Sequence, residues 1–410
     1  GTGPDPEVEN VMATGQTEYM PAGYSGDIAD TPAIWVDTDD PSRSVILGSR
    51  KAASAGGIDV YGLDGARISF LPAGEINNVA LRDLKGKAGW GDRILVIGTN
   101  RTDSTLTYAW LSRTTRTLTA AGSTAVGFEP YGCCLYISPV NGDIYAFVSE
   151  STGGAGGLKQ YRLTLSGSTV SGTQVRSMPT ATLSEGMACD DATQTLFLGE
   201  EDVGLFKYGA EPGAGTSRTE IDLVGGGRLF ADVEGITIAY GRGSDPDYLI
   251  VSSQGDSTFV AYDLAAPHAF VKKWHVVGDS GLIGETTDTD GIAVSTEDFS
   301  PFWPDGIFVA HDTANTDVSQ AASNFKLVDL GRIFPELSHR AADVALPSSS
   351  TASLTGPAAR WLKSPMDALW FDTVAEEWRA IIPTSTGHRM VRLDDVDTAA
   401  SVMGAVVSAD

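Results

Sequence analysis

The sequence is poor in cysteine, in basic residues and in long apolar segments, and each shortage excludes a class of protein. Its 3 cysteines in 410 residues are too few for a disulfide framework, and no Cys-x-x-Cys or Cys/His pair suggests a zinc site. No stretch of about 18 apolar residues occurs, so nothing is expected to span a membrane. With 28 basic and 53 acidic residues the net charge is −25, which argues against nucleic acid and anionic membrane surfaces as partners.

Several catalytic motifs are missing as well. The 5 histidines lie outside any HExxH or paired-histidine pattern, which disfavours zinc chemistry and a phosphohistidine mechanism. There is no GxSxG nucleophile elbow, no P-loop and no GxGxxG after a strand. The cysteines are expected to be buried free thiols. The excess of acid is compatible with cation binding, although a solubilising surface charge is the commoner cause.

Glycine and short apolar segments are abundant. The 47 glycines, together with Asp, Asn and Ser, separate segments such as RILVIGT, IYAFVS, YLIVSS and GIFVA, which are typical of β-strands. No longer window has a helical period. We therefore expect an all-β protein.

A polar or acidic residue, often followed by Gly, precedes an apolar strand six times. These residues are at positions 30, 77, 131, 185, 234 and 290, at intervals of 47, 54, 54, 49 and 56. Six near-equal periods of about 50 residues predict a six-bladed β-propeller. The sixth period lacks an outer strand, and we expect residues 9–20 to supply it and close the ring.

The propeller domain is expected to occupy residues 1–335. An Ala/Ser/Thr-rich linker is expected at 336–360, followed by a C-terminal extension at 361–410. Three apolar segments of this extension suggest a small antiparallel sheet, to which the sequence assigns no role.

In a propeller, the starts of the first strands and the ends of the second strands lie on one rim. The starts carry Asp30, Asn77, Asn78, Tyr131, Glu185, Asp232, Glu234, Asp288 and Asp290. The ends carry Arg50, Lys51, Arg101, Glu201, Gln254 and Asp312. An acid before Gly, taken alone, is more often a turn residue. The convergence of all these residues on one rim indicates a site.

The chemistry of this rim favours a hard cation. Carboxylates clustered with amide and carbonyl oxygens, without His or Cys, suit calcium above all. Asp232 and Glu234 would point the same way from one strand and could share or bridge ions. Calcium ions beside Arg50, Lys51 and Arg101 would bind phosphate, and metal-bound water is a plausible nucleophile toward a phosphomonoester.

At these residues the chain resembles the β-propeller phytases, the calcium-dependent alkaline phytases of bacteria. The matching stretches include GDIADTPAIWV (26–36), SEGMACDD (184–191), GEEDVGLFKYGAEP (199–212), DVEGITIAY (232–240) and TDTDGI (287–292). The resemblance implies a six-bladed propeller that hydrolyses phytate, the hexakisphosphate of inositol, with several calcium ions at the channel mouth. It also implies a 3-phytase type of enzyme, a calcium–phytate complex as substrate, a monomer, and a secreted or periplasmic location.

The resemblance implies a role for each matching residue. Catalytic calcium and its water would be held by Asp30, Glu185, Glu201, Asp232, Glu234, Gln254 and Asp290. Phosphate would contact Tyr131, Arg101, and Arg50 or Lys51. Structural calcium sites would include Glu18, Asn77 and Asn78. We expect Glu185, Asp232, Glu234 and Tyr131 to be catalytic, and Asp288 and Asp312 to be further metal ligands.

The chain departs from the family pattern at three places. Thr31 replaces a second Asp, residues 148–157 lack a lysine that the family carries there, and Gly284-Glu285 replaces an Asp-Gly. Weaker calcium binding, or a changed pH or substrate preference, would follow. Two alternatives stay open: another propeller hydrolase, such as a lactonase or a different phosphoesterase, and a propeller that only binds calcium because its site has decayed. The basic residues facing the acids disfavour a lactonase, and the largely intact acid cluster disfavours decay.

Overall fold

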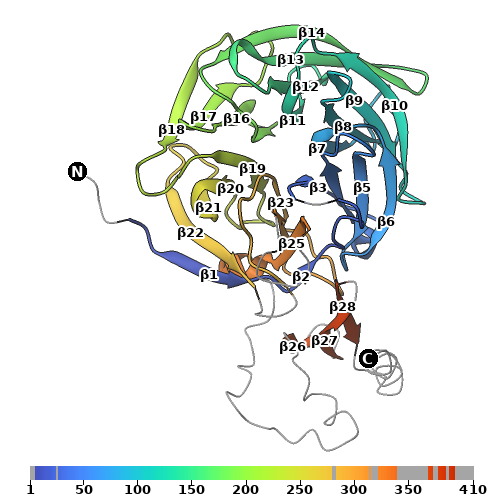
Figure 1. Ribbon diagram of the computed structural model, residues 1–410, viewed down its shortest axis with the longest axis vertical. Coiled ribbons are helices and arrows are strands. Elements are labelled where there is room, and N and C mark those ends of the chain that lie inside the picture. The colour runs from blue at the N-terminus through green and yellow to red at the C-terminus, as the bar shows by residue number, and fades with distance from the viewer. Residues whose placement is uncertain are drawn as a thin grey trace, which may run out of the picture.

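The computed structural model describes residues 5–24, 26–278, 283–313, 315 and 322–338, and the backbone of three strands between 368 and 392. Six sheets surround a central channel (Figure 1), so the predicted all-β, six-bladed β-propeller is confirmed. Each blade runs outward from its innermost strand through strands that follow in sequence and pair antiparallel, and blades 5 and 6 receive an additional outer strand from the N-terminal segment.

The first three blades have four strands each. Blade 1 comprises β3 (Ala29–Trp35), β4 (Val45–Arg50), β5 (Gly57–Gly62) and β6 (Arg67–Pro72). Blade 2 comprises β7 (Ile76–Asp83), β8 (Ile94–Asn100), β9 (Thr105–Leu111) and β10 (Leu118–Ala125). Blade 3 comprises β11 (Pro130–Ile137), β12 (Ile144–Glu150), β13 (Gly154–Ser166) and β14 (Thr169–Thr180).

The other three blades complete the ring. Blade 4 comprises β15 (Met187–Asp190), β16 (Thr195–Glu200), β17 (Gly204–Gly209) and β18 (Arg218–Leu223). Blade 5 comprises β19 (Val233–Ala239), β20 (Tyr248–Ser253), β21 (Thr258–Asp263) and β22 (Phe270–Val277). Blade 6 comprises β23 (Ile292–Ser295), β24 (Ile307–Asp312) and β25 (Asn324–Asp329). The described helices are all short: η1 (Pro41–Arg43), η2 (Gln254–Asp256), α1 (Leu330–Ile333) and η3 (Pro335–Leu337).

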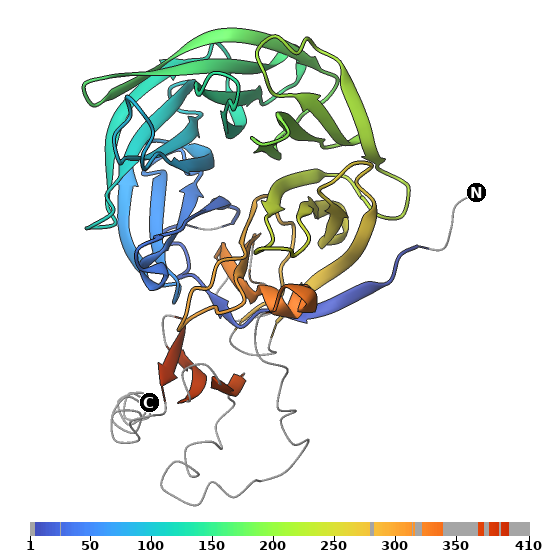
Figure 2. The ribbon, with the colours of Figure 1, turned by 180° about the vertical axis from the view of Figure 1, so that it is seen from behind.

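The N-terminal segment closes the ring, as predicted. Strand β2 (Gly15–Gln16) pairs antiparallel with β25 and is the outer strand of blade 6. Strand β1 (Val8–Met12) does something the sequence did not suggest: it pairs parallel with β22 and adds a fifth strand to blade 5. Figure 2 shows both strands from behind, along the edges of these two blades.

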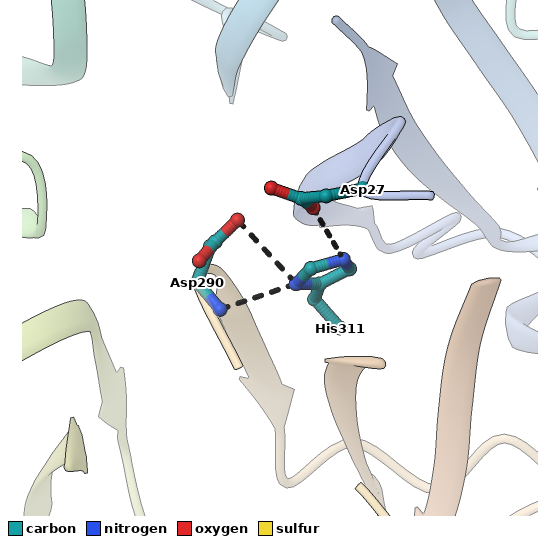
Figure 3. A group of neighbouring side chains, drawn as sticks. All are labelled: Asp27, Asp290 and His311. Carbon is teal, nitrogen blue, oxygen red and sulfur yellow. Dashed lines mark hydrogen bonds and ion pairs between the residues drawn. The ribbon is translucent and has the colours of Figure 1, made fainter. Parts of the chain in front are cut away.

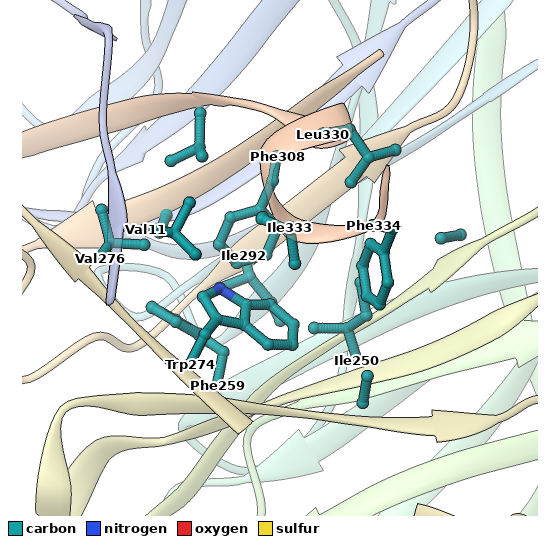
Figure 4. Packing of buried hydrophobic residues seen from close by; sticks show 14 of the residues in the cluster. Val11, Ile250, Phe259, Trp274, Val276, Ile292, Phe308, Leu330, Ile333 and Phe334 are labelled. Atoms are coloured by element: carbon teal, nitrogen blue, oxygen red, sulfur yellow. The ribbon is translucent and has the colours of Figure 1, made fainter. Parts of the chain in front are cut away.

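The ends of the propeller chain pack on one apolar cluster between blades 5 and 6. At its centre the ring of Trp274 lies 5.8 Å from that of Phe259 and 5.6 Å from that of Phe334, centroid to centroid (Figure 4). Val11 from β1 and Ile333 from α1 belong to the same cluster. Because first and last elements share this core, apolar burial holds the ring closed.

The C-terminal extension contains the expected small sheet. It consists of β26 (Ala368–Asp372), β27 (Glu377–Thr384) and β28 (Gly387–Arg392), antiparallel and in that order. Residues 336–338 continue the described propeller chain, and the rest of the predicted linker at 336–360 lies outside the described residues. The domain boundaries thus stay predictions. In the described part of the chain, no helix has the length and hydrophobicity that a membrane span requires.

Candidate active site

The glycines that follow the rim acids are packing residues, not the turn residues that each motif alone would suggest. A Cβ on Gly186 would lie 1.9 Å from the carbonyl oxygen of Glu234, and one on Gly235 would lie 2.5 Å from that of Asp290. Neither glycine has a positive φ. The starts of the inner strands of blades 4 and 5 therefore touch the backbone of the next blade at its rim acid, which brings Glu185, Glu234 and Asp290 together at one mouth of the channel.

Hydroxyl groups on the second strands fix the same spacing. Ser49 accepts a hydrogen bond from the Thr31 amide of its own blade (2.8 Å) and donates one to the Asn77 carbonyl of the next blade (2.7 Å). Thr99 repeats this link one blade further on, between the Asn78 amide (2.9 Å) and the Tyr131 carbonyl (2.6 Å). These links position the rim residues of blades 1 to 3 relative to one another.

The channel is a cavity of about 520 Å³ lined by the innermost strands of all six blades. Glu185 and Asp290 line it at the end where the inner strands begin, and Asp190 and Tyr240 line it where they finish.

Three buried glutamates form the most acidic part of the mouth. Glu185, Glu201 and Glu234 each offer a carboxylate oxygen, and these oxygens lie within 4.8 Å of one another. Within the described residues, Oε1 of Glu201 and Oε2 of Glu234 are buried and have no hydrogen-bond partner. A buried carboxylate without a partner is unfavourable unless it is protonated or binds a cation.

The pKa values of the three glutamate carboxyl groups are raised, because these groups are buried close to one another. Burial, followed by the charges of neighbouring acids, raises the pKa of Glu185 and Glu234 well above the usual range. Burial and then Asp232 raise the pKa of Glu201 to about 7. The site therefore holds protons when no cation is present, and a cation would replace them.

Amide groups and a tyrosine surround the glutamates. The side-chain amides of Asn77 and Asn78 both donate to Oε1 of Glu185, at 2.8 and 2.6 Å. The hydroxyl of Tyr131 faces Glu201 and opposes the rise in the pKa of that carboxyl. Burial, together with Glu185 and Glu234, raises the pKa of Tyr131 itself, so its hydroxyl stays a proton donor.

A second acidic group lies beside the first, around Lys51. The Nζ atom of Lys51 is 2.6 Å from Asp27, 2.8 Å from Asp30 and 2.9 Å from Asp290. Burial alone would raise the pKa of Asp30, but the charge of Lys51 lowers it overall. Gln254 donates to the other oxygen of Asp290 at 2.6 Å.

Asp27 and His311 belong to this group, and the sequence reasoning missed both. Figure 3 shows the His311 ring between Asp27 and Asp290. The ring accepts a hydrogen bond at Nδ1 from the Asp290 amide (3.1 Å), and its Nε2 lies 3.4 Å from Oδ1 of Asp27. Burial lowers the pKa of His311, so the ring is neutral and its proton is on Nε2. Position 311 adjoins the predicted Asp312, and strand alternation would have identified it.

Asp232 and Glu234 do not share one environment. A β-bulge separates Val233 from Ile236 in the pairing of β19 with β20, and Glu234 is buried whereas Asp232 is half-exposed. Burial and the charge of Asp202 raise the pKa of Asp232. Asp232 thus lies at the outer edge of the acidic mouth, next to Glu201, and Glu234 lies inside it.

The predicted phosphate ligands differ in how close they lie to the acidic mouth. Arg101 lies near the mouth, where it donates to Asn77 (3.3 Å) and to Glu129 (2.8 Å). Arg50 is only 4% exposed. It forms a two-point ion pair with Asp59, at 2.9 and 2.5 Å, and stacks on the ring of Phe70. The geometry therefore brings Lys51 and Arg101, but not Arg50, to the acids.

The remaining predicted ligands make their described contacts with residues outside the two acidic groups. Glu18 accepts a hydrogen bond from the Arg67 amide. Asp312 is fully buried and forms an ion pair with Lys326 at 2.8 Å. Asp288 is exposed and has a positive φ of 45°.

Two of the departures from the family pattern have visible consequences. The Thr31 hydroxyl donates to Oδ1 of Asp30 at 2.6 Å, so a hydrogen-bond donor replaces an acid there. Glu285 lies 3.5 Å from Nε2 of His275, outside the two acidic groups.

The donor set fits calcium. It offers carboxylate and amide oxygens, two of the carboxylate oxygens are buried without a partner, and the glutamates are close enough to contact the same ion. The histidine of the second group presents an N–H rather than a lone pair, which disfavours metals that need nitrogen ligands.

Comparison with known proteins identifies the family. A family model described as Phytase matches residues 5–345. A 3-phytase of Bacillus subtilis (strain 168) is 34% identical over 346 residues, which cover 81% of this chain and 87% of that protein. Among solved structures, an alpha-L-arabinofuranosidase from Fusarium graminearum matches with a TM-score of 0.49 and 10% identity, over 78% of this chain and 99% of that one. A luciferin-regenerating enzyme matches with a TM-score of 0.47 and 9% identity, over 77% and 95%.

The family match at residues 5–345 spans all six blades and both acidic groups of the mouth. The chain therefore belongs to the phytase family.

Proposed function

We propose that the protein is a calcium-dependent phytase that releases phosphate from myo-inositol hexakisphosphate at the acidic mouth of the channel. The observation that carries this proposal is the buried group Glu185, Glu201 and Glu234, whose carboxylate oxygens lie close enough together to bind one cation. One oxygen of Glu201 and one of Glu234 are buried without a hydrogen-bond partner. The family match and the 3-phytase relative support the substrate and the 3-phytase type.

Calcium would be held by Glu185, Glu201 and Glu234, with Asp232 at the edge and Asp30, Gln254 and Asp290 alongside. When bound, it would lower the pKa of a water molecule and neutralise charge on the phosphate. The attack on phosphorus would be direct, by water and without a covalent enzyme intermediate. The histidine of the mouth, His311, is fully buried and accepts a hydrogen bond from the Asp290 amide, which does not suit it to be a nucleophile.

The protein's own residues bind and orient the phosphate. Asp30, Asp290 and Asp27 raise the pKa of Lys51, so the ammonium group stays charged at the mouth. Arg101 is anchored by Glu129 and Asn77, and its side chain is still 30% exposed. The protonated Tyr131 hydroxyl is the third donor toward a phosphate oxygen. Such fixed donors stabilise the charge that develops during phosphoryl transfer.

Three further parts of the proposal rest on the family resemblance: a calcium complex of phytate as the substrate, a monomeric enzyme, and a secreted or periplasmic location. The structural calcium sites proposed from the resemblance, with Glu18, Asn77 and Asn78, have a weaker basis. Asn77 and Asn78 already bind Glu185, and Glu18 contacts the backbone near Arg67.

One experiment tests the proposal: phosphate release from phytate with calcium, with EDTA, and with Glu234→Gln. We expect release in calcium, none in EDTA, and a loss of roughly 100-fold or more in the variant. Glu220→Gln, an exposed glutamate of β18, is the matched control and should behave as the wild type. Absence of release at every calcium concentration would refute the phytase assignment, and release unaffected by EDTA would refute the role of calcium.

A further inference from the structure

Two of the three cysteines face each other across the boundary between blades 3 and 4. Cys134 is on β11 and Cys189 is on β15, and their sulfur atoms are 3.3 Å apart. Both thiols are free and buried, each 5% exposed, within the apolar cluster that joins these blades. Both residues are also among those that line the central channel.

The two sulfur atoms are in direct non-bonded contact, with no other group between them. A disulfide has a sulfur–sulfur distance of about 2.05 Å, so the two atoms would need to approach by roughly 1.3 Å, which small side-chain rotations on adjacent strands can supply. The strands are already neighbours, because Gly132 of β11 touches the backbone of Glu185 just before β15. No large backbone movement is required.

We propose that Cys134 and Cys189 form a reversible disulfide that links blades 3 and 4 at the wall of the channel. A small disulfide compound can act as oxidant. One cysteine thiolate attacks it and releases one thiol, and the other cysteine then displaces the second thiol from the mixed disulfide. Two cysteine thiols and one disulfide thus yield the protein disulfide and two small thiols, and the electrons pass to the oxidant.

The environment of the two thiols determines how fast the disulfide forms. Burial and the adjacent Cys134 thiol raise the pKa of Cys189, whereas Arg82 opposes this rise. Few thiolates are therefore present at neutral pH, so reaction with the folded protein is slow and small oxidants that enter the channel are favoured. Once formed, a buried disulfide between two rigid strands is protected from reductants by the same burial.

The bond would stabilise the propeller. It would close a loop whose ends are 55 residues apart in the sequence, and for loops of this size the loss of chain entropy in the unfolded state corresponds to a rise in Tm of roughly 5 °C. The bond would also connect the strand that carries Tyr131 to the one that follows Glu185. This inference concerns the scaffold and is independent of the proposed phytase chemistry.

The chain offers a matched control in Cys133. It is adjacent to Cys134, is similarly buried, and belongs to the other cluster, between blades 2 and 3. Burial raises the pKa of the Cys133 thiol, as it does that of Cys189. A difference in reactivity between these two cysteines would therefore come from the position of the neighbouring thiol.

The experiment treats the folded protein and the variants Cys133→Ala, Cys134→Ala and Cys189→Ala with hydroxyethyl disulfide, with or without later reduction by dithiothreitol. We expect the wild type and Cys133→Ala to lose two thiols, to give a Cys134–Cys189 linked peptide, and to gain roughly 5 °C in Tm that reduction reverses. Comparing oxidised and reduced Tm within each variant removes any intrinsic effect of the substitution.

Three results would overturn the proposal. The first is retention of all thiols in folded wild type after prolonged treatment. The second is a linked peptide in Cys134→Ala, where Cys133 is the remaining partner for Cys189, and the third is an equal Tm gain in Cys134→Ala or Cys189→Ala.

Discussion

Replacing Glu201 with glutamine separates the cost of its buried charge from its contribution to a calcium site. In the metal-free protein the pKa of Glu201 is about 7, above its usual value of 4.5. The folded state therefore binds this proton more tightly than the unfolded state, and stability falls as the pH rises through this window. At about pH 8 the full difference corresponds to about 3 kcal/mol of unfolding free energy.

Glu201→Gln should therefore stabilise the metal-free protein at about pH 8, by up to about 3 kcal/mol, and have little effect at about pH 4. In calcium the order should reverse, because the wild-type carboxylate binds the ion more strongly than an amide does. Urea unfolding at both pH values, in calcium and in EDTA, measures these differences. Equal pH slopes for the two proteins in EDTA would refute the argument from burial, and an unchanged order in calcium would refute the role of Glu201 as a ligand.

Three further substitutions test which residues contribute to stability and which to phosphate release. Arg50→Met should lower the unfolding free energy by about 2 kcal/mol, because buried Asp59 loses one of its two ion-pair partners and keeps Arg67, while phosphate release per folded molecule stays within about twofold. Lys51→Met should lower phosphate release at least about tenfold in calcium. Steady-state kinetics compare the two variants. A larger loss of activity in Arg50→Met than in Lys51→Met would contradict the assignment of Lys51, rather than Arg50, to the phosphate. Gly186→Ala should cost at least about 3 kcal/mol in urea unfolding, because its Cβ would lie 1.9 Å from a backbone oxygen. Gly213→Ala, which has open space around it, is the control, and equal costs would contradict the packing argument.

The number of blades could be predicted from the sequence because each inner strand begins with a polar residue at the channel mouth, and this happens once per blade. The closing strand could be predicted because blade 6 was one strand short. The parallel pairing of β1 with β22 could not, since it joins Val8 to Lys273 and nothing in either segment marks the other as its partner. The packing role of the glycines was also hidden, because it depends on the neighbouring blade.

Two of the predicted site residues, Arg50 and Asp312, pair away from the acids for the same physical reason. The sequence locates the end of a strand, but a shift of one residue turns a side chain to the opposite face. Arg50 and Asp312 occupy predicted positions, yet each pairs with a partner inside its own blade. Their neighbours Lys51 and His311 face the mouth instead.

The distribution of charge around the mouth determines where we expect the first cation to bind. The sequence predicted basic residues on one side and acids on the other, but Lys51 lies among the acids and compensates Asp30 and Asp290. Glu201 and Glu234 have carboxylate oxygens without any such partner in the described chain. A cation gains most where no lysine competes with it, so calcium should bind first at the glutamates. An ion at the second group would have to displace Lys51, which would then be free to contact the phosphate.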